Sequence, residues 1–316
     1  MTLQASLSVV VPVYRSEDSL PELAAALNTV LPQVAERYEL VLVCDGSPDH
    51  SWDVIEQLCA QYPWVRGIHL MRNYGQHNAL LCGVRSAQYD IVATMDDDLQ
   101  HPPEELAQLL QKLNEGFDVV YGSPAQEQHG LWRDLASQVT KWALQSSMSV
   151  DIARRVSAFR VFRTRLRDAF ATYGSPYVNL DVLLTWGTTR FAAVTVRHDA
   201  RKYGASNYTF RKLVTHALNM ITGFSVVPLQ IASLLGFAFA AFGGLVLIYV
   251  IGRAALFGIV VPGFAFLAST IALFAGAQLF ALGIIGEYLA RVHFRTMDRP
   301  VYTVRETTGS NALNHP

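Results

Sequence analysis

Short apolar runs alternate along the first part of the chain with longer segments in which apolar residues recur every three or four positions. The runs are rich in Val, Ile and Leu, which is typical of strands buried on both faces. They occupy residues 7–14, 38–43, 65–71, 91–95, 117–121 and 191–196. This alternation predicts an α/β domain built on a mainly parallel sheet.

The segments between these runs have the apolar spacing of amphipathic helices. In the first of them Leu20, Leu23, Leu27 and Leu31 share one face, and Pro21 stands in the first turn, where its missing N–H is not needed. Further helices are predicted over residues 52–62, around residues 80–84, and over residues 103–114 and 131–148. In a sheet of this kind, ligands bind outside the carboxyl ends of the strands.

Two long intervals toward the C-terminus contain no Asp, Glu, Lys or Arg. One lies between Lys212 and Arg253 and the other covers residues 254–286, and each exceeds the about 20 residues that a membrane-spanning helix needs. The predicted segments are a cytoplasmic α/β domain at residues 1–212, an interfacial amphipathic helix at 213–228, spans at 229–251 and 264–286, an external link at 252–263 and a tail at 287–316.

Basic residues gather on the outer flanks of the two spans. The link carries Arg253, whereas Lys212 precedes the first span and Arg291 and Arg295 follow the second. By the positive-inside rule, both termini are cytoplasmic. The sequence therefore predicts an integral protein of the inner (cytoplasmic) membrane with two spans, whose polar end after Thr307 is disordered.

The composition fits a membrane protein that also has a water-soluble domain. Of 316 residues, 51% are hydrophobic and 16% are charged, below the roughly 25% charged residues of an average soluble protein. The net charge of −1 gives no global basic field, which argues against nucleic acid as a partner. Cys44, Cys59 and Cys82 lack metal-ligand spacing, as expected for free thiols in a reducing compartment.

Three consecutive carboxylates follow the apolar run at residues 91–95. Asp96, Asp97 and Asp98 repel one another at the end of a buried strand, and a divalent cation is the simplest group that would hold them there. Mg²⁺ and Mn²⁺ choose oxygen ligands and usually bind together with phosphates. The alternative is that the acids only favour the positive N-terminal end of the next helix.

Other polar residues extend this candidate site. Asp45 and Asn73 also follow predicted strands, so one cleft at the carboxyl edge of the sheet can collect them with the acids. Arginines are concentrated at residues 151–167, and a second basic stretch covers residues 197–208. These stretches fit an anionic head group, phosphate or lipid, and a solvated surface face explains them equally well.

With these motifs in hand, the chain resembles the family 2 glycosyltransferases of GT-A fold, in the branch that acts on polyprenyl phosphates. That branch includes dolichyl-phosphate mannose synthase and the undecaprenyl-phosphate glucosyltransferases and formamido-arabinose transferases. The matching motifs are VVVPVYRSEDSL at residues 9–20, LVLVCDGSPDHSW at 40–52, RNYGQHNALLCG at 72–83, MDDDLQHPPE at 95–104, RKYGASNY at 201–208 and GEYLARVHFRTMDRPVY at 286–302. The resemblance implies a GT-A-like (Rossmann-like) domain followed by two transmembrane helices.

The resemblance also implies roles for the matched residues on the donor side. The residues implied to bind the nucleotide-sugar donor are Pro12, Tyr14, Asp45, Asn73, Gly75, Gln76 and Asp96. Asp96 and Asp98 match the two acids of the family's D-x-D motif and are the implied catalytic residues. Together with Gln100 they would bind Mg²⁺ or Mn²⁺, while Asp97 falls on the variable middle position.

On the acceptor side, the resemblance implies that Arg133 and Ser137 receive the phosphate of the polyprenyl lipid. Arg201 matches the first residue of the family's R-x-x-G-x-S-x-Y motif and joins them. An arginine that relatives often carry after the fifth strand is Pro124 here. Arg160, Arg163 or Lys141 is expected to compensate for it.

The implied activity is an inverting, metal-dependent transfer of a sugar, UDP-linked by expectation, to undecaprenyl phosphate at the cytoplasmic membrane face. A processive polysaccharide synthase is the nearest alternative, since Gln138 to Trp142 partly echoes its Q-x-x-R-W motif. A non-catalytic sugar-nucleotide-binding module is the second, favoured by Cys44 in place of the family's usual Asp. Small residues of the second span, Ala277 and Ala281, suit packing within one chain or in a homo-oligomer.

Overall fold

The computed structural model describes residues 6–124, 155–175, 177–199, 202, 226–257, 263–297 and 299–309. The chain divides into two compact units. One comprises Met1–Leu213 together with Asp298–Pro316, and the other comprises Val214–Met297. The C-terminal segment thus belongs to the first unit, although the second unit separates this segment from Met1–Leu213 in the sequence.

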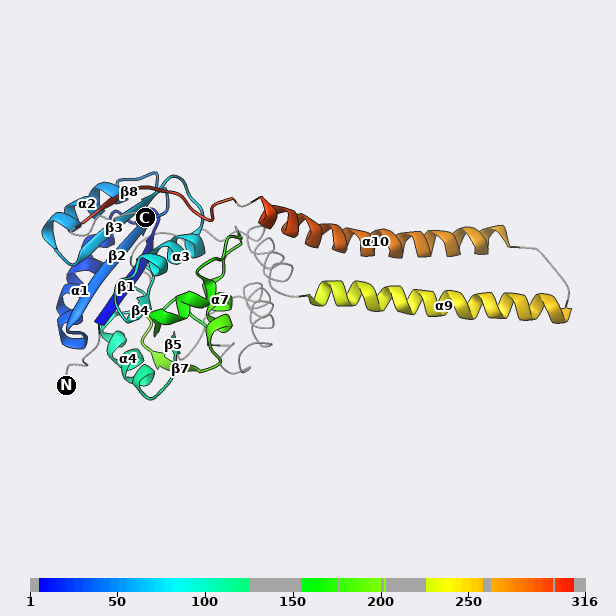
Figure 1. The fold of residues 1–316 in the computed structure, drawn as a ribbon, viewed down its shortest axis with the longest axis horizontal. Coiled ribbons are helices and arrows are strands. Elements are labelled where there is room, and N and C mark those ends of the chain that lie inside the picture. Colours follow the sequence, from blue (N-terminus) through cyan, green and yellow to red (C-terminus); the bar gives the residue numbers. More distant parts are fainter. Residues whose placement is uncertain are drawn as a thin grey trace. The chain divides into compact units, whose positions relative to one another are not determined.

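The described part of the first unit is built on an eight-stranded sheet in the order β7-β5-β6-β4-β1-β2-β3-β8 (Figure 1). The strands are β1 (Ser6–Val13), β2 (Arg37–Cys44), β3 (Val65–Leu70), β4 (Ile91–Thr94), β5 (Val119–Pro124), β6 (Arg160–Arg163), β7 (Phe191–Val196) and β8 (Val304–Thr308). The central four, β4-β1-β2-β3, are parallel. The predicted mainly parallel α/β sheet is confirmed.

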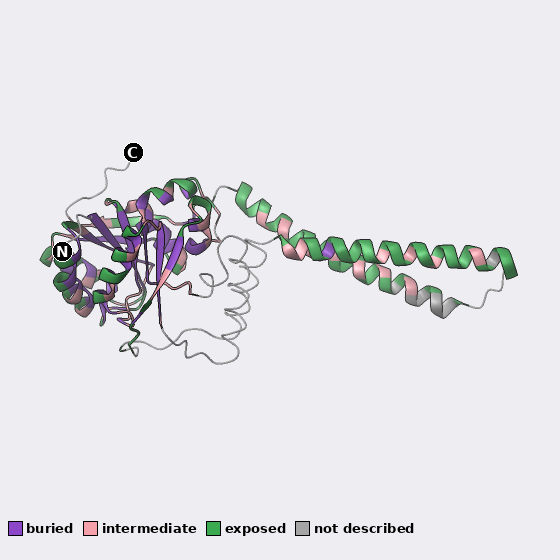
Figure 2. Cartoon of the chain, turned by 90° about the horizontal axis from the view of Figure 1, so that it is seen from below, coloured by how far each residue is buried: buried purple, intermediate pink, exposed green. Residues whose placement is uncertain are grey.

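Helices cover both faces of the sheet because successive side chains of a strand point to opposite sides. Val9 and Val11 of β1 pack with α1, α2 and α4, whereas Val10 packs with α3, α7 and η2. The α-helices of the sheet domain are α1 (Leu20–Val34), α2 (Ser51–Gln61), α3 (Gln76–Ser86), α4 (Leu106–Asn114) and α7 (Leu180–Gly187), with 3₁₀ turns η1 (Pro103–Glu105) and η2 (Thr164–Phe170). The buried residues concentrate in the strands between these layers (Figure 2).

Two strands have no counterpart in the sequence pattern. β6 lies antiparallel between β4 and β5, and its four residues begin and end with arginine, which hid the strand inside a basic stretch. β8 lies antiparallel beside β3, and Met71 N donates to Thr303 O over 2.9 Å just beyond this pairing. The expectation of disorder after Thr307 is therefore wrong for Thr308, which pairs with Gly67.

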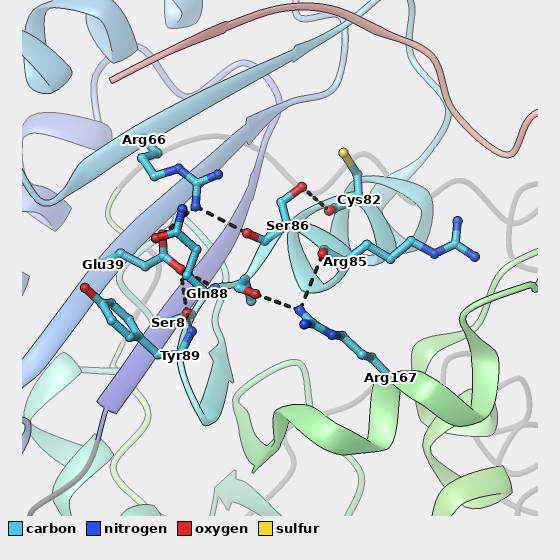
Figure 3. A network of polar contacts seen from close by, with 10 residues as sticks. Ser8, Glu39, Arg66, Cys82, Arg85, Ser86, Gln88, Tyr89 and Arg167 are labelled. Carbon is cyan, nitrogen blue, oxygen red and sulfur yellow. Dashed lines mark hydrogen bonds and ion pairs between the residues drawn. The ribbon is translucent and has the colours of Figure 1, made fainter. Parts of the chain in front are cut away.

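A polar network ties the strands together near their amino ends (Figure 3). The Arg66 guanidinium of β3 lies 2.6 Å from the Glu39 carboxylate of β2, and both side chains are nearly inaccessible. Glu39 also accepts hydrogen bonds from Ser8 Oγ of β1 at 2.6 Å and from Gln88 N at 2.7 Å. Because each partner belongs to a different segment, this buried ion pair fixes the packing of three parallel strands.

The second unit contains two long apolar helices, α9 (Val227–Phe257) and α10 (Phe264–Thr296), which contact each other through Phe239 and Phe274 with ring centroids 5.7 Å apart. Val227–Phe257 has a mean hydropathy of 2.4 and Leu273–Thr296 of 1.5. By length and composition both can span a membrane, and their surfaces are largely exposed (Figure 2). The predicted interfacial helix at 213–228 lies almost entirely outside the described residues.

Candidate active site

The candidate site lies where the central parallel strands end. Tyr14 follows β1, Asp45 follows β2, Asn73 follows β3 and Asp96 follows β4. Since these strands are parallel neighbours, their carboxyl ends meet at one edge of the sheet. Tyr14 and Asn73 are exposed there, whereas Pro12, the residue before the end of β1, is buried.

Asp45 binds the loop that leads into α3. Its two carboxylate oxygens accept hydrogen bonds from Tyr74 N at 2.7 Å and Gly75 N at 2.8 Å. The side chain is 3% exposed, and this burial raises the pKa of Asp45 although the two backbone donors partly offset it. Gly75 has a φ of 97°, which favours glycine. Asp45 therefore shapes the loop that carries Asn73 and Gly75.

A second close approach brings the loops after β2 and β3 together. Gly46 has a φ of 58°, and a Cβ added there would lie 2.4 Å from Arg72 C and 2.6 Å from Asn73 N. Arg72 stacks its guanidinium over the Tyr74 ring at 4.2 Å. A side chain at Gly46 would thus push away the loop that presents Asn73.

The acids after β4 are held by neighbouring segments. Asp96 Oδ1 accepts a hydrogen bond from Gln76 Nε2 of α3 at 2.7 Å. Asp98 Oδ1 accepts one from Gln100 N at 3.1 Å, across a turn in which Leu99 has a φ of 60°. Asp96, Asp98 and Gln100 are all partly accessible, so a ligand can reach them.

Asp97 has a contact that its variable position in the motif gave no reason to expect. Its carboxylate accepts a hydrogen bond from Ser16 Oγ of the loop after β1. Burial raises the pKa of Asp97 to about 6, against the opposing effect of that hydrogen bond. Sequence reasoning missed this pair because Ser16 and Asp97 are 81 residues apart.

Two histidines border the acids. Asp199 N donates to Gln100 O over 2.8 Å, which brings the segment after β7 against the loop after β4 that carries Asp96, Asp97 and Asp98 (the acidic loop). His198 Nε2 then lies 3.5 Å from Gln100 Nε2, and its ring lies 4.8 Å from that of His101. His101 also stacks on Phe159 at 5.2 Å, and burial lowers its pKa to about 4, so its ring is neutral at neutral pH.

The donor set at this edge fits a hard divalent cation. Two carboxylates, Asp96 and Asp98, and the amide of Gln100 follow one strand and supply oxygen ligands of the type that Mg²⁺ or Mn²⁺ prefers. Among the described residues, no group of three or more His, Cys, Asp and Glu side chains is placed to hold a metal. A cation at this edge would therefore rely on the amide of Gln100 and on oxygens from its ligand.

Of the predicted acceptor residues, Arg160 and its alternative Arg163 are among those described. Arg160 is 1% exposed, and its guanidinium donates to the Asp181 carboxylate and to Thr94 Oγ1, the latter at 2.9 Å. Tyr121 OH donates to the same Asp181 oxygen at 3.1 Å. Arg160 thus forms an internal ion pair next to Thr94, two residues before Asp96, and this geometry favours a supporting role. Arg133, Ser137, Lys141 and Arg201 lie outside the described residues.

Comparisons with known proteins agree with this architecture. The sequence model of glycosyl transferase family 2 matches residues 8–172. Among solved structures, glucosyl-3-phosphoglycerate synthase from Mycobacterium tuberculosis superposes with a TM-score of 0.51 at 17% identity, covering 69% of this chain and 78% of that one. At this identity the likeness shows the fold, which is the GT-A-like fold that the family resemblance implied.

Relatives of nearly full length are more similar. The undecaprenyl-phosphate 4-deoxy-4-formamido-L-arabinose transferase of Pectobacterium atrosepticum is 32% identical over 96% of this chain and 94% of its own length. The protein of the same name from Shewanella sediminis is 33% identical over 95% and 92%. This similarity extends over the two apolar helices as well as the sheet. The chain therefore belongs to glycosyl transferase family 2, and it is a glycosyltransferase.

Proposed function

We propose that this glycosyltransferase moves a sugar from a UDP-linked donor to undecaprenyl phosphate at the cytoplasmic face of the membrane, with inversion at the anomeric carbon. The observation that carries the proposal is the similarity, over nearly the whole chain, to relatives named for transfer to undecaprenyl phosphate. Both apolar helices support it, since they would keep the sheet domain beside a lipid acceptor.

The donor nucleotide would bind along the loops after β1, β2 and β3. Exposed Tyr14 and Asn73 offer a ring and an amide to the base and ribose, and buried Pro12 supports the first of these loops. Asp45 acts through the backbone of Gly75, whose missing side chain lets the ligand come close. Gln76, the first residue of α3, would lie between this nucleotide end and Asp96.

Asp96, Asp98 and Gln100 would hold Mg²⁺ or Mn²⁺ beside the donor diphosphate. When bound, the cation supplies positive charge that stabilises the departing nucleoside diphosphate. The acids are accessible and the Gln76 contact already orients one of them. Asp96 and Asp98 are accordingly the proposed catalytic residues.

The acceptor phosphate would attack the anomeric carbon directly. It is ionised near neutral pH, so no strong general base is required, and most of the rate comes from positioning. We propose Arg133, Ser137 and Arg201 as the groups that hold it, with Arg160 in a supporting role. An Arg133→Ala variant should raise the KM for lipid phosphate and leave the KM for donor unchanged; the opposite pattern would remove Arg133 from the acceptor site.

The donor sugar is proposed by analogy with the same relatives, whose names specify 4-deoxy-4-formamido-L-arabinose. Its UDP derivative is therefore the first donor to test, beside UDP-glucose and a GDP-sugar as comparisons. A processive synthase would extend the product into a polymer, and a non-catalytic module would bind nucleotide without turnover.

The test uses the purified full chain in detergent with undecaprenyl phosphate and each donor, with Mg²⁺, Mn²⁺ or EDTA. We expect release of UDP that requires both lipid and cation, with one sugar added to each lipid. Release of UDP without lipid would indicate hydrolysis or another acceptor. A polymeric product would support the synthase, and no release with any donor would support the binding module.

A further inference from the structure

The loop after β1 has a backbone conformation that needs outside support. Arg15 has a φ of 60°, one of two positive values among the described non-glycine residues. Such a conformation is disfavoured for a side chain with a Cβ and persists where the surroundings hold it. This loop presents Tyr14 at the candidate donor site and Ser16 to the acidic loop.

The support comes from two serine hydroxyls, that of Ser47 in the loop after β2 and that of Ser51, the first residue of α2. Ser47 Oγ accepts a hydrogen bond from Arg15 N at 2.7 Å, and Ser51 Oγ accepts one from Ser16 N at 3.0 Å. Ser51 is fully buried. Each hydroxyl has one hydrogen to donate, and both donate it to the carboxylate of Asp49.

Asp49 therefore sets the direction of both hydrogen-bond relays. Its carboxylate only accepts, so Ser47 and Ser51 must point their hydrogens at it and turn their lone pairs to the amides of Arg15 and Ser16. Asp49 Oδ2 additionally accepts from Glu17 N at 3.4 Å. One side chain thus orders three successive backbone amides.

Ser16 connects the loop after β1 with the acids after β4. The Ser16 amide is fixed by Ser51, and its hydroxyl donates to Asp97, which lies between Asp96 and Asp98. Asp49 is thereby linked to the nucleotide end of the site through Arg15 and to the acidic loop through Ser16. Asp49 would therefore act on both parts of the site through these residues and not by contact with the ligand.

We propose that Asp49 is a positioning residue of the donor site, which fixes the loop after β1 and the register of the acidic loop for nucleotide binding. This inference rests on the proposed use of a nucleotide-sugar donor. The competing explanation is that Asp49 only caps α2, because it also accepts from Ser51 N at 3.3 Å. A cap affects stability, whereas a positioning residue affects donor affinity.

Asp49→Asn is the sharpest test because it keeps size and shape but replaces one acceptor oxygen by a donor. If the amide oxygen takes the Oδ1 position, the new NH₂ faces Glu17 N and Ser51 Oγ; in the opposite orientation it faces Ser47 Oγ and Ser51 N. Either orientation therefore removes at least one of the hydrogen bonds that order the loop after β1. Asp53→Asn is the matched control. Asp53 lies in the first turn of α2, is exposed, and contacts exposed His50 over 2.8 Å.

The full chain in detergent with Mg²⁺ is titrated with UDP by calorimetry, and donor and lipid KM values and the apparent Tm are measured in parallel. We expect Asp49→Asn to weaken UDP binding and raise the donor KM by about tenfold, as for one buried donor left without its acceptor. The lipid KM should stay unchanged, and Asp53→Asn should match the unsubstituted chain in every measurement.

The proposal is overturned if Asp49→Asn lowers only the Tm, or lowers kcat while UDP affinity and donor KM stay the same. If this variant does not fold, Ser47→Ala replaces it, since it removes only the relay to Arg15, and a UDP affinity equal to that of the unsubstituted chain then overturns the proposal. Absence of lipid-dependent turnover in a chain that binds UDP refutes the proposed function alone. An unsubstituted chain that binds no UDP overturns both.

Discussion

Gln76 Nε2 donates a hydrogen bond to Asp96 Oδ1 over 2.7 Å, so the first residue of α3 holds the first acid after β4. Gly75, the residue before it, is bound in turn by Asp45. The amino end of α3 therefore connects the loop after β2 with the acidic loop. A displacement of one of these loops would therefore also move the other.

Replacing Gln76 with Ala should lower donor kcat/KM by roughly 10- to 100-fold, because a hydrogen bond to a charged group contributes about 1.5–3 kcal/mol. Steady-state kinetics at saturating lipid measures it. Gln108→Ala is the control, since Gln108 is exposed on α4 and bonds only Glu105 among its described contacts, at 2.9 Å. Equal kcat/KM values for the two variants would show that Gln76 does not orient Asp96.

Asp98→Ala should reduce lipid-dependent transfer at least about 100-fold, because the cation would lose a charged ligand. Insertion into membranes should be unaffected, since Asp98 lies in the sheet domain and not in α9 or α10. Product formation and the membrane-bound fraction are measured together. Asp168→Ala, an exposed carboxylate of η2, serves as control. Near-normal activity of a folded Asp98→Ala protein would refute the metal-site assignment.

Arg66→Met should lower the free energy of unfolding by about 3–5 kcal/mol, because it leaves the Glu39 carboxylate buried without its counter-charge. Denaturant unfolding of the full chain, followed by tryptophan fluorescence, measures the change. The double variant Glu39→Gln with Arg66→Met should recover part of the loss. Lys112→Met, which breaks a more accessible pair with Glu115, should cost less than about 1 kcal/mol. Similar losses in the two single variants would contradict the structural role of the buried pair.

Asp118 should make the sheet domain sensitive to acid. Burial alone would raise its pKa, but hydrogen bonds from Thr188 and Arg165 and the charge of Arg190 outweigh that effect, so the net pKa is lowered. A carboxyl whose pKa is lower in the folded chain adds stability above its unfolded pKa of about 3.8 and loses that contribution as pH falls through the folded value.

Asp118→Asn should therefore be less stable than the unsubstituted chain by about 1–2 kcal/mol near neutral pH, and the difference should shrink below about pH 4. Denaturant unfolding at a series of pH values measures this difference. Asp168→Asn controls for the loss of a surface charge. A gap between Asp118→Asn and the unsubstituted chain that stays constant down to pH 3 would mean that ionisation of Asp118 does not stabilise the fold.

Much of the fold could be predicted from the sequence because runs of apolar residues indicate buried segments directly. The strands that became β1 to β5 and β7 were predicted from such runs, and so were the two long apolar helices. β6 was not, because Arg160 and Arg163 at its ends look like a solvated surface until Asp181 is seen to neutralise Arg160. β8 was missed because its residues are polar and its partner β3 lies more than 200 residues earlier.

Part of the candidate site could also be predicted from the sequence, because it depends on the predicted strands. Asp45, Asn73 and Asp96 follow predicted parallel strands, so topology alone places them at one edge. The relay from Asp49 through Ser51 and Ser16 had no such signal, because serine and aspartate in loops are common and carry no periodicity.

The sequence by itself determined the class of fold, the two apolar helices and the residue types at the carboxyl edge, because apolar periodicity and the succession of strands and helices along the chain are local properties. Only the tertiary structure decided which of those residues touch. It pairs Gln76 with Asp96, joins Ser16 to Asp97, and commits Arg160 to Asp181. Hydrogen bonds act over about 3 Å, and contacts at that range between distant segments depend on how the whole sheet packs.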